Sequence, residues 1–483
     1  MYCPQTNAYT KFFVAIFFSI LSIQSFAQGN SFSFGELSAT KYKEKIAQLE
    51  KFKVSKKYDD KSAQAWYKEI LSDRNKSLQY AFKENKVVYD SFLLTKCNDI
   101  FRRIMAANRN YNFDSITLYI NRSVIANAVC YGEGTIMINL GLFFWVDNDD
   151  ELAMVIAHEL AHQLLKHSDR KIEKSIAMLT SEDFKEELKD IKKSNEGKYS
   201  RFRELMKDLN IESGKHSTYK ESEADSLGAV LIKNAGYDVN KGAKILLKLD
   251  NTDDIFKSKK LYTLKEYLEN TGIDLSHFNV KPKYNGLSSM NVEMNADKDF
   301  DSIKTHPDCI KRYKTITGNT DTASIVCCTE LNSSYAAYKE NAMLETVRYL
   351  YENNSLGWCI HLSLIAIKNN YDPVVYNRFL SLCFSKLYDD DKRLARFSGA
   401  NADAERESNL KETQDYLFAA NTADLEKLAL HFLKYKVDTN SEDYLFADLM
   451  YNTQIKMKDA NSAYESFLNK FPKSKYQYLI QKK

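Results

Sequence analysis

The pattern of hydrophobic and polar positions divides the chain into segments of different period. Residues 37–110 contain charged runs with helical spacing, such as 42–52 and 87–107, which predict two or three amphipathic helices. The period then changes, because two short β-branched runs at 115–120 and 135–139 predict strands on either side of a stretch with a glycine turn. After about residue 330 the pattern is helical throughout. A mainly helical protein with one small sheet is expected.

The segment AMVIAHELAHQLLKH, residues 153–167, predicts a helix that carries chemistry. Asn148 and Glu151, three positions apart, predict a capping box at its start. Because residues four apart share one helix face, His158 and His162 can bind a single ion. Glu159 lies about 100° around the axis, within reach of a water on that ion. Zinc suits this arrangement, since it accepts neutral imidazole and leaves a position for water.

The alternative is a buried helix that carries two structural histidines. The chain has 8 His in 483 residues, and an H-E-x-x-H pattern is expected by chance in only about one such chain in a hundred. The neighbouring side chains are apolar, and burying two imidazoles and a carboxylate among them without partners would cost several kcal/mol. A metal ion with its water would satisfy all three groups. We therefore expect a zinc site.

The segment ESEADSLGA supplies a candidate third ligand, 59 residues after the second histidine (221 − 162). Glu221 and Asp225 are four positions apart, so both can face the first helix. We assign Glu221 as the ligand, and expect Asp225 to accept an N–H from a zinc-bound histidine and fix its tautomer. Ala224 and Gly228 share this spacing and allow the two helices to approach closely. Glu223 points elsewhere and is interpreted as a solvated carboxylate.

These motifs together resemble one family of gluzincin peptidases. H-E-x-x-H followed by E-x-x-A-D-x-x-G is similar to the CAAX prenyl proteases, the heat-shock membrane protease HtpX and the β-barrel-assembly-enhancing proteases. The segments 127–144, 236–249 and 305–313 also match the family, in the same order. An exported form with C-terminal helices is most similar to the β-barrel-assembly-enhancing branch. The resemblance implies an α+β, mainly α, zincin-like domain with a small β-sheet beside the active-site helix.

The resemblance also implies roles for residues outside the two helices. His306 would face the zinc, either donating to the oxyanion or ligating the metal in a closed resting state. Pro307 would fix a turn, and Arg312 would hold this segment through a carboxylate. The strand predicted at 135–139 would be the edge that pairs with an extended substrate, although an ordinary core strand is the alternative. The residues assigned to substrate binding are Asn127, which would shape the cleft, and Ile136, Met137, Ile138 and Asn139.

The first 27 residues resemble a secretory signal. An apolar run follows Lys11, and small residues at Ser25 and Ala27 predict cleavage after Ala27. The run is shorter than the ~20 residues that span a bilayer, and an uncleaved anchor is the alternative. No later segment reaches 18 apolar residues, so a soluble exported protein, periplasmic or secreted, is expected. Seven cysteines would remain, an odd number that specifies no disulfide framework. A net charge of +3 gives no reason to expect nucleic acid as a partner.

The remaining segments complete the expected organisation. We predict a signal peptide (1–27), N-terminal helices of the peptidase domain (28–110), a zinc metallopeptidase core (111–325) and an all-α tetratricopeptide-like domain (330–483). A plain helical bundle is the alternative for the last of these. The charged stretch 169–215 is either a lid or a solvated helical hairpin. The histidines that match no motif are interpreted as structural or solvent-facing: His167, His216, His277, His361 and His431.

The sequence therefore predicts an exported metalloendopeptidase that holds one Zn²⁺ per chain and cleaves protein substrates. Its C-terminal helices would select those substrates, which by family analogy are misassembled envelope or outer-membrane proteins. One alternative is a chaperone or scaffold that acts through the helical domain while the zinc site stays shut. Another is an esterase or other hydrolase built on the same zinc scaffold.

Overall fold

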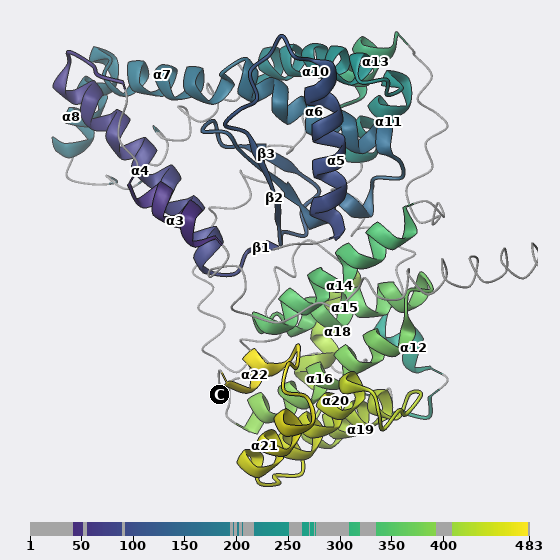
Figure 1. Cartoon of the computed structure of the whole chain (residues 1–483). Helices are drawn as coiled ribbons and strands as arrows, with labels where there is room; N and C mark the ends of the chain where they lie inside the picture. The colour runs from purple at the N-terminus through teal and green to yellow at the C-terminus, as the bar shows by residue number, and fades with distance from the viewer. Residues whose placement is uncertain are drawn as a thin grey trace, which may run out of the picture.

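The computed structural model describes residues 42–51, 56–88, 92–193, 197, 200–201, 205, 217–250, 263–269, 271–274, 276, 309–318, 335–392 and 408–481. Figure 1 shows a small sheet among helices in the upper half of the molecule and a second group of helices below it. Mainly helical structure with one small sheet confirms the predicted fold class. Among the described residues, we find no helix that is both long and apolar enough to serve as a membrane span.

The elements follow the chain in the order shown in Figure 1. The N-terminal part contains α3 (Lys43–Glu50), α4 (Lys61–Lys83), β1 (Val87–Val88), α5 (Phe92–Ala107), β2 (Thr117–Asn121), β3 (Ala128–Cys130), β4 (Thr135–Asn139) and the 3-10 helix η1 (Leu140–Phe144). The middle part contains α6 (Asp149–Leu164), α7 (His167–Leu179), α8 (Glu182–Lys193), α10 (Ser217–Asn234), α11 (Val239–Leu249), α12 (Leu264–Leu268) and α13 (Cys309–Thr317). The last part contains α14 (Ala336–Glu352), α15 (Leu356–Lys368), α16 (Pro373–Lys392), α18 (Ser408–Ala419), α19 (Thr422–Leu433), α20 (Glu442–Gln454), α21 (Ala460–Lys470) and α22 (Gln477–Gln481).

The sheet has the strand order β1-β2-β4-β3. β4 lies inside the sheet, parallel to β2 on one side and antiparallel to β3 on the other. The turn between β3 and β4 needs a glycine at Gly134, which has φ +87°, and a Cβ there would lie 2.1 Å from the backbone oxygen of Ser115. β3 forms one edge of the sheet, and α6 packs against it.

Part of the segment predicted to be helical is a strand instead. The sequence pattern predicts a helix over 87–107, whereas Val87 and Val88 form β1 and pair antiparallel with β2. Both side chains are buried. Two adjacent buried β-branched residues fit a strand that packs on both faces better than one face of a surface helix. The helix itself begins at Phe92.

The zinc-motif helix α6 begins where the sequence predicted. Asn148 is its N-cap and accepts a hydrogen bond from the backbone N–H of Glu151 at 2.9 Å. The second half of the predicted capping box differs, because the Glu151 carboxylate accepts from the N–H of Asp147 rather than from that of Asn148. The same carboxylate also binds the buried ammonium group of Lys248 on α11. The start of α6 is thus tied to α11 by an ion pair.

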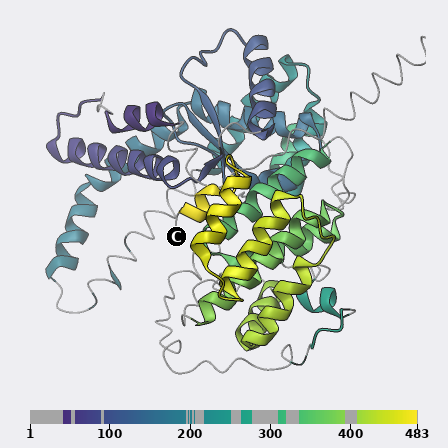
Figure 2. The same cartoon turned by 60° about the horizontal axis from the view of Figure 1, so that its bottom comes forward.

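The C-terminal helices share a large buried cluster, which we call the helical core. It includes Ile360 of α15, Phe384 of α16, Phe432 of α19 and Phe446 of α20. Phe384 and Phe432 stack with their ring centroids 5.5 Å apart. α12, which lies within the segment predicted as peptidase, contributes Leu264 and Leu268 to this core. Figure 2 shows these helices side by side. Whether they form tetratricopeptide-like repeats remains a prediction.

Buried polar contacts join the helical core to the sheet and to α6. The ammonium of Lys339 on α14 binds Asp147 just before α6. The guanidinium of Arg122, after β2, binds Glu345 of α14 at 3.4 Å. Phe92 of α5 stacks on Tyr338 of α14 with ring centroids 4.4 Å apart. The first helix of the C-terminal group is therefore packed firmly against the part of the chain that carries the zinc motif.

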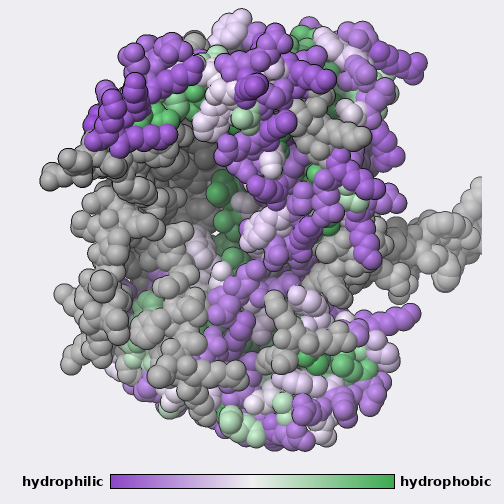
Figure 3. Space-filling model, turned by 90° about the vertical axis from the view of Figure 1, so that its left-hand side faces the viewer, coloured by the Kyte–Doolittle hydropathy of each residue, from purple (hydrophilic) through white to green (hydrophobic). Residues whose placement is uncertain are grey.

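The described part of the predicted lid or hairpin forms α7 and α8. α7 leads from α6 toward an outer arm that also contains α3 and α4, and it packs on α4. Viewed from the side of this arm, the surface is mostly hydrophilic, and hydrophobic side chains show inside a hollow (Figure 3). Residues 194–196 and 206–216 lie outside the described residues, so the choice between lid and hairpin stays open.

Candidate metal centre

The centre is built where α6 and α10 cross at close range. Gly228 of α10 faces the backbone of α6, and a Cβ added there would lie 3.2 Å from the backbone nitrogen of His158. Ala224, one turn earlier on α10, is completely buried. Small residues at this spacing let the two helices approach closely. The approach brings the side chains of α10 that lie near its start to the histidines of α6.

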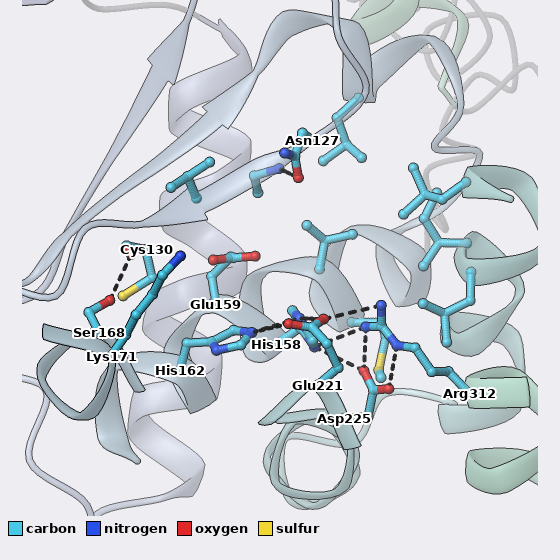
Figure 4. Close-up of a pocket in the computed structure, with 18 residues that line it drawn as sticks. Asn127, Cys130, His158, Glu159, His162, Ser168, Lys171, Glu221, Asp225 and Arg312 are labelled. Carbon is cyan, nitrogen blue, oxygen red and sulfur yellow. Dashed lines mark hydrogen bonds and ion pairs between the residues drawn. The ribbon is translucent and has the colours of Figure 1, made fainter. Parts of the chain in front are cut away.

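Three side chains from these helices converge on one point (Figure 4). The Nε2 atoms of His158 and His162 are 3.0 Å apart. The carboxylate of Glu221 lies 3.3 Å from the first of these nitrogens and 3.5 Å from the second. One ligand atom from each residue lies within 4.8 Å of the others. Two imidazole nitrogens and one carboxylate oxygen are a donor set that suits zinc with an open fourth position, so these residues fit the ion.

Asp225 and Arg312 support this group from outside. The Nδ1 atom of His158 lies 2.9 Å from Asp225 Oδ1. The guanidinium of Arg312, on α13, donates two hydrogen bonds to the two oxygens of Asp225, at 2.7 and 2.8 Å. A third nitrogen of Arg312 lies 3.2 Å from Glu221 Oε2. One buried arginine thus fixes both carboxylates of α10 relative to His158.

The pKa values of these groups follow from their burial and from the charges beside them. Burial disfavours charge on His158, yet hydrogen bonds to Asp225 and Glu221 outweigh it and raise its pKa to about 10. Burial likewise opposes ionisation of Glu221, but the neighbouring His158 and Arg312 lower its pKa to about 2. At His162 burial dominates, and the pKa falls to about 3. Two ionised carboxylates facing neutral or protonatable imidazoles are the electrostatic setting that a divalent cation needs.

Glu159, next to His158 on α6, points into the same pocket (Figure 4). Its side chain is buried, and burial raises its pKa to about 7 although the nearby His158 opposes the shift. A backbone hydrogen bond from Cys130 of β3 acts on it as well. The pocket has a volume of about 420 Å³. Its apolar wall comes from three elements: Leu142 of η1, Met154 and Val155 of α6, and Ile245, Leu246 and Leu249 of α11.

The strand beside the pocket is β3, which corrects one prediction. The residues predicted to pair with substrate, Ile136, Met137, Ile138 and Asn139, belong to β4, whose five residues are all buried. Because β4 already pairs with β2 and β3 on its two sides, it cannot accept another strand. Ala128, Val129 and Cys130 of β3 line the pocket instead, together with Asn127. The Asn127 side chain accepts the N–H of Ala128 at 2.8 Å.

Two residues outside the predicted site also lie at the centre. His167, the first residue of α7, is buried, and its Nδ1 atom is 2.8 Å from Nδ1 of His162. Glu223 is not a freely solvated carboxylate, because its Oε2 atom lies 3.2 Å from Nε2 of His167 and 3.5 Å from Arg170. Helical periodicity gives no signal for these contacts, since they depend on a break between α6 and α7. His306 and Pro307 lie outside the described residues.

Comparison with known proteins agrees with this geometry. Residues 95–320 match the model of peptidase family M48. Peptidases of this family are zinc-dependent metallopeptidases, and the matched segment contains the His–His–Glu group, Asp225 and Arg312. The β-barrel assembly-enhancing protease of Yersinia pestis is 31% identical over 87 residues, a stretch that covers 18% of this chain and 18% of that protein. The predicted resemblance is confirmed at the level of the family.

Proposed function

We propose that the protein is a zinc-dependent metalloendopeptidase in which His158, His162 and Glu221 hold one zinc ion and Glu159 is the general base. The observation that carries the proposal is the convergence of these three donors, within 4.8 Å of one another, beside a buried glutamate in one pocket. When bound, the ion would supply a Lewis acid that acidifies a water and polarises the scissile carbonyl.

We assign the remaining catalytic and positioning roles to side chains of the protein. Glu159 would take a proton from the attacking water and return it to the leaving amine, which requires a base that stays near the nucleophile without binding the metal. Asp225 would hold the Nδ1–H of His158 and so present its Nε2 to the ion. Arg312 would keep Asp225 ionised and in place. His306, from the family resemblance, would donate to the oxyanion or ligate the ion in a resting state.

β3 offers an edge for an extended substrate. The backbone N–H of Asn139 donates to the carbonyl of Asn127, and the N–H of Tyr131 donates to the carbonyl of Thr135. The backbone hydrogen-bonding groups of alternate residues therefore point toward β4. The backbone carbonyl of Ala128 therefore points to the opposite side. At Cys130, two residues on, the N–H already donates to Glu159 and the carbonyl accepts from Ser168 at 3.2 Å, so this edge offers the carbonyl of Ala128. We propose that a substrate strand adds to this edge beside the metal ligands, as in other β-augmentation complexes.

The proposal places the protein in the cell envelope or outside the cell. The N-terminal signal predicted at 1–27 supports export to a periplasm or to the outside of the cell. Among known proteins the chain is similar, over a short stretch, to a β-barrel assembly-enhancing protease. We propose a role in quality control of envelope proteins, with the C-terminal helices selecting substrates, and this likeness supports it. N-terminal sequencing of the exported protein would test the first step, and it should begin at Gln28.

Substitution of Glu159 tests the proposed chemistry. Glu159→Gln should retain about one zinc per chain and lose at least about 10³-fold in the rate of casein cleavage, because the proton acceptor is lost while the ligands remain. His158→Ala should lose the metal as well. Glu187→Gln, on the exposed face of α8, is the matched control and should behave as wild type.

Two outcomes would contradict the proposal. Wild-type protein that binds no zinc would remove its basis. Full proteolytic activity in Glu159→Gln would show that another group acts as the base. If Glu159→Gln complemented a deletion strain as well as wild type did, the scaffold function would be favoured over proteolysis.

A further inference from the structure

His162 is held by a chain of side chains that lies outside the zinc motif. Its Nδ1 atom is 2.8 Å from Nδ1 of His167, and the two rings meet edge to face with centroids 4.8 Å apart. On its other side, Nε2 of His167 lies 3.2 Å from the carboxylate of Glu223. The chain Glu223–His167–His162 therefore ends at the ring whose Nε2 faces the other two metal donors.

A break in the helix creates this contact. In a continuous α-helix, residues five apart lie about 140° from each other around the axis, so their rings could not meet. Here α6 ends at Leu164, and Lys166 adopts a left-handed conformation with φ 54°. α7 then starts in a new direction with His167 as its first residue. Lys220 of α10 fixes that start by donating to the backbone oxygen of His167 at 3.2 Å.

The hydrogen bonds can be assigned from the role of His162. If Nε2 gives its lone pair to a metal, the ring proton must be on Nδ1. That N–H then donates to Nδ1 of His167, 2.8 Å away, which must be the unprotonated nitrogen of a neutral ring. The proton of His167 is therefore on Nε2, where it donates to Glu223. Every donor in the chain has one acceptor, and no tautomer conflict arises.

The two zinc ligands of α6 are thus supported differently. His158 donates directly to Asp225, a carboxylate that Arg312 holds. His162 reaches its carboxylate through an intervening imidazole, and that carboxylate, Glu223, is one-quarter exposed. Positions 221 and 223 lie about 200° apart around α10. One face of α10 therefore carries the metal ligand Glu221. The opposite face carries Glu223, which supports the ligand His162 through His167.

We propose that His167 and Glu223 are positioning residues that hold His162 in the tautomer and orientation needed to bind the metal through Nε2. The inference rests on the proposed zinc site and adds to it a second support, independent of Asp225. It assigns a role to a histidine outside the H-E-x-x-H motif and to a glutamate that is not a ligand. Their contribution should show in metal affinity, since outer hydrogen-bond partners of ligating histidines affect it strongly.

The experiment measures zinc affinity of the full chain by competition with a chromophoric chelator. His167→Phe keeps a ring of similar shape but removes the acceptor, and it should weaken zinc binding about 10- to 100-fold. His167→Asn restores an acceptor near the position of Nδ1 and should stay within about threefold of wild type. Glu223→Ala removes the next link and should cost less, about 3- to 10-fold. His431→Phe, in the helical core region, is the matched control and should bind zinc as wild type does.

A spectroscopic readout separates positioning from general stability. Cobalt-substituted His167→Phe should show altered visible absorption bands, because the geometry at His162 changes, whereas His167→Asn should resemble wild type. Equal zinc affinity and equal cobalt spectra in wild type, His167→Phe and Glu223→Ala would overturn the inference while leaving the zinc site intact. If His167→Phe fails to fold, Glu223→Ala, which leaves both rings in place, decides the matter by the same measurements. Wild-type protein that binds neither metal would instead refute the proposed function.

Discussion

Removing the charge of Arg312 should destabilise the centre strongly, because its side chain is buried between two carboxylates. Its guanidinium makes two short hydrogen bonds to Asp225, whose side chain is only 4% exposed. In Arg312→Met the Asp225 carboxylate keeps His158 as a partner but loses its counter-ion. Breaking a buried ion pair from one side costs about 3–5 kcal/mol. We expect the free energy of unfolding to fall by this amount.

A double variant tests whether the unpaired Asp225 carboxylate causes the loss of stability in Arg312→Met. In Arg312→Met with Asp225→Asn, the amide oxygen of residue 225 can still accept from His158. Glu221, the other carboxylate beside Arg312, keeps His158 as its partner. Replacing both partners of a buried pair by neutral groups is often close to neutral for stability. The double variant should therefore recover most of the stability lost in Arg312→Met, although neutral Asn should still weaken zinc binding by about tenfold.

Urea unfolding in the presence of a chelator measures these differences without stabilisation by bound metal. Tryptophan fluorescence is a suitable signal, because Trp145 is buried in the core beside α6. Arg102→Met is the matched control, since Arg102 pairs with Asp99 on the surface with 69% of its side chain exposed. That variant should change stability by less than about 0.5 kcal/mol. A loss below about 1 kcal/mol in Arg312→Met, or a double variant no more stable than that single one, would refute the reasoning.

Three further changes test the packing of the protein, two of them beside α6 and one in the C-terminal helices. Gly228→Ala should cost about 1–3 kcal/mol and weaken zinc binding, because the new Cβ would lie 3.2 Å from the backbone of His158; Ser226→Ala, on the exposed face of α10, should do neither. Lys248→Met should lower the urea midpoint by about 1 M or more, because it leaves the buried carboxylate of Glu151 without its cation, whereas Asp147 keeps Lys339. His361 is buried, and burial lowers its pKa to about 4, so only the unfolded chain gains a proton below about pH 6.5. Wild type should thus lose about 1.4 kcal/mol more than His361→Leu between pH 7.5 and 5.5, and equal pH slopes in urea titrations would contradict this.

The sequence predicted the parts of the site that depend on the period of a single helix. The spacing of His158 and His162, and that of Glu221 and Asp225, each place two side chains on one helix face, and the structure shows both pairs facing each other. The contact between the two helices could be expected from the small residues of α10, one of which is Gly228. The family resemblance, rather than any spacing, pointed to Arg312.

The errors have a common physical origin, since the hydrophobic period of one segment does not show which other segments lie beside it. The alternation at 135–139 predicted a strand correctly, but the pattern of one strand does not reveal whether its edges are occupied. β4 is covered on both sides, and the edge belongs to β3, whose three residues are too few to give a recognisable pattern. Val87 and Val88 were likewise assigned to a helix because their partner strand lies more than thirty residues away.

His167 shows the same limit at the metal centre itself. Its distance of five residues from His162 excludes contact in an unbroken helix, and the contact exists because Lys166 accepts a left-handed conformation. A lysine in that conformation costs about 1 kcal/mol relative to glycine, and the structure places the compensation nearby: the backbone of His167 accepts from Lys220, and its ring joins Glu223 to His162. The turn that ends α6 is thus part of the centre, since it brings in the imidazole that supports the second histidine of the motif.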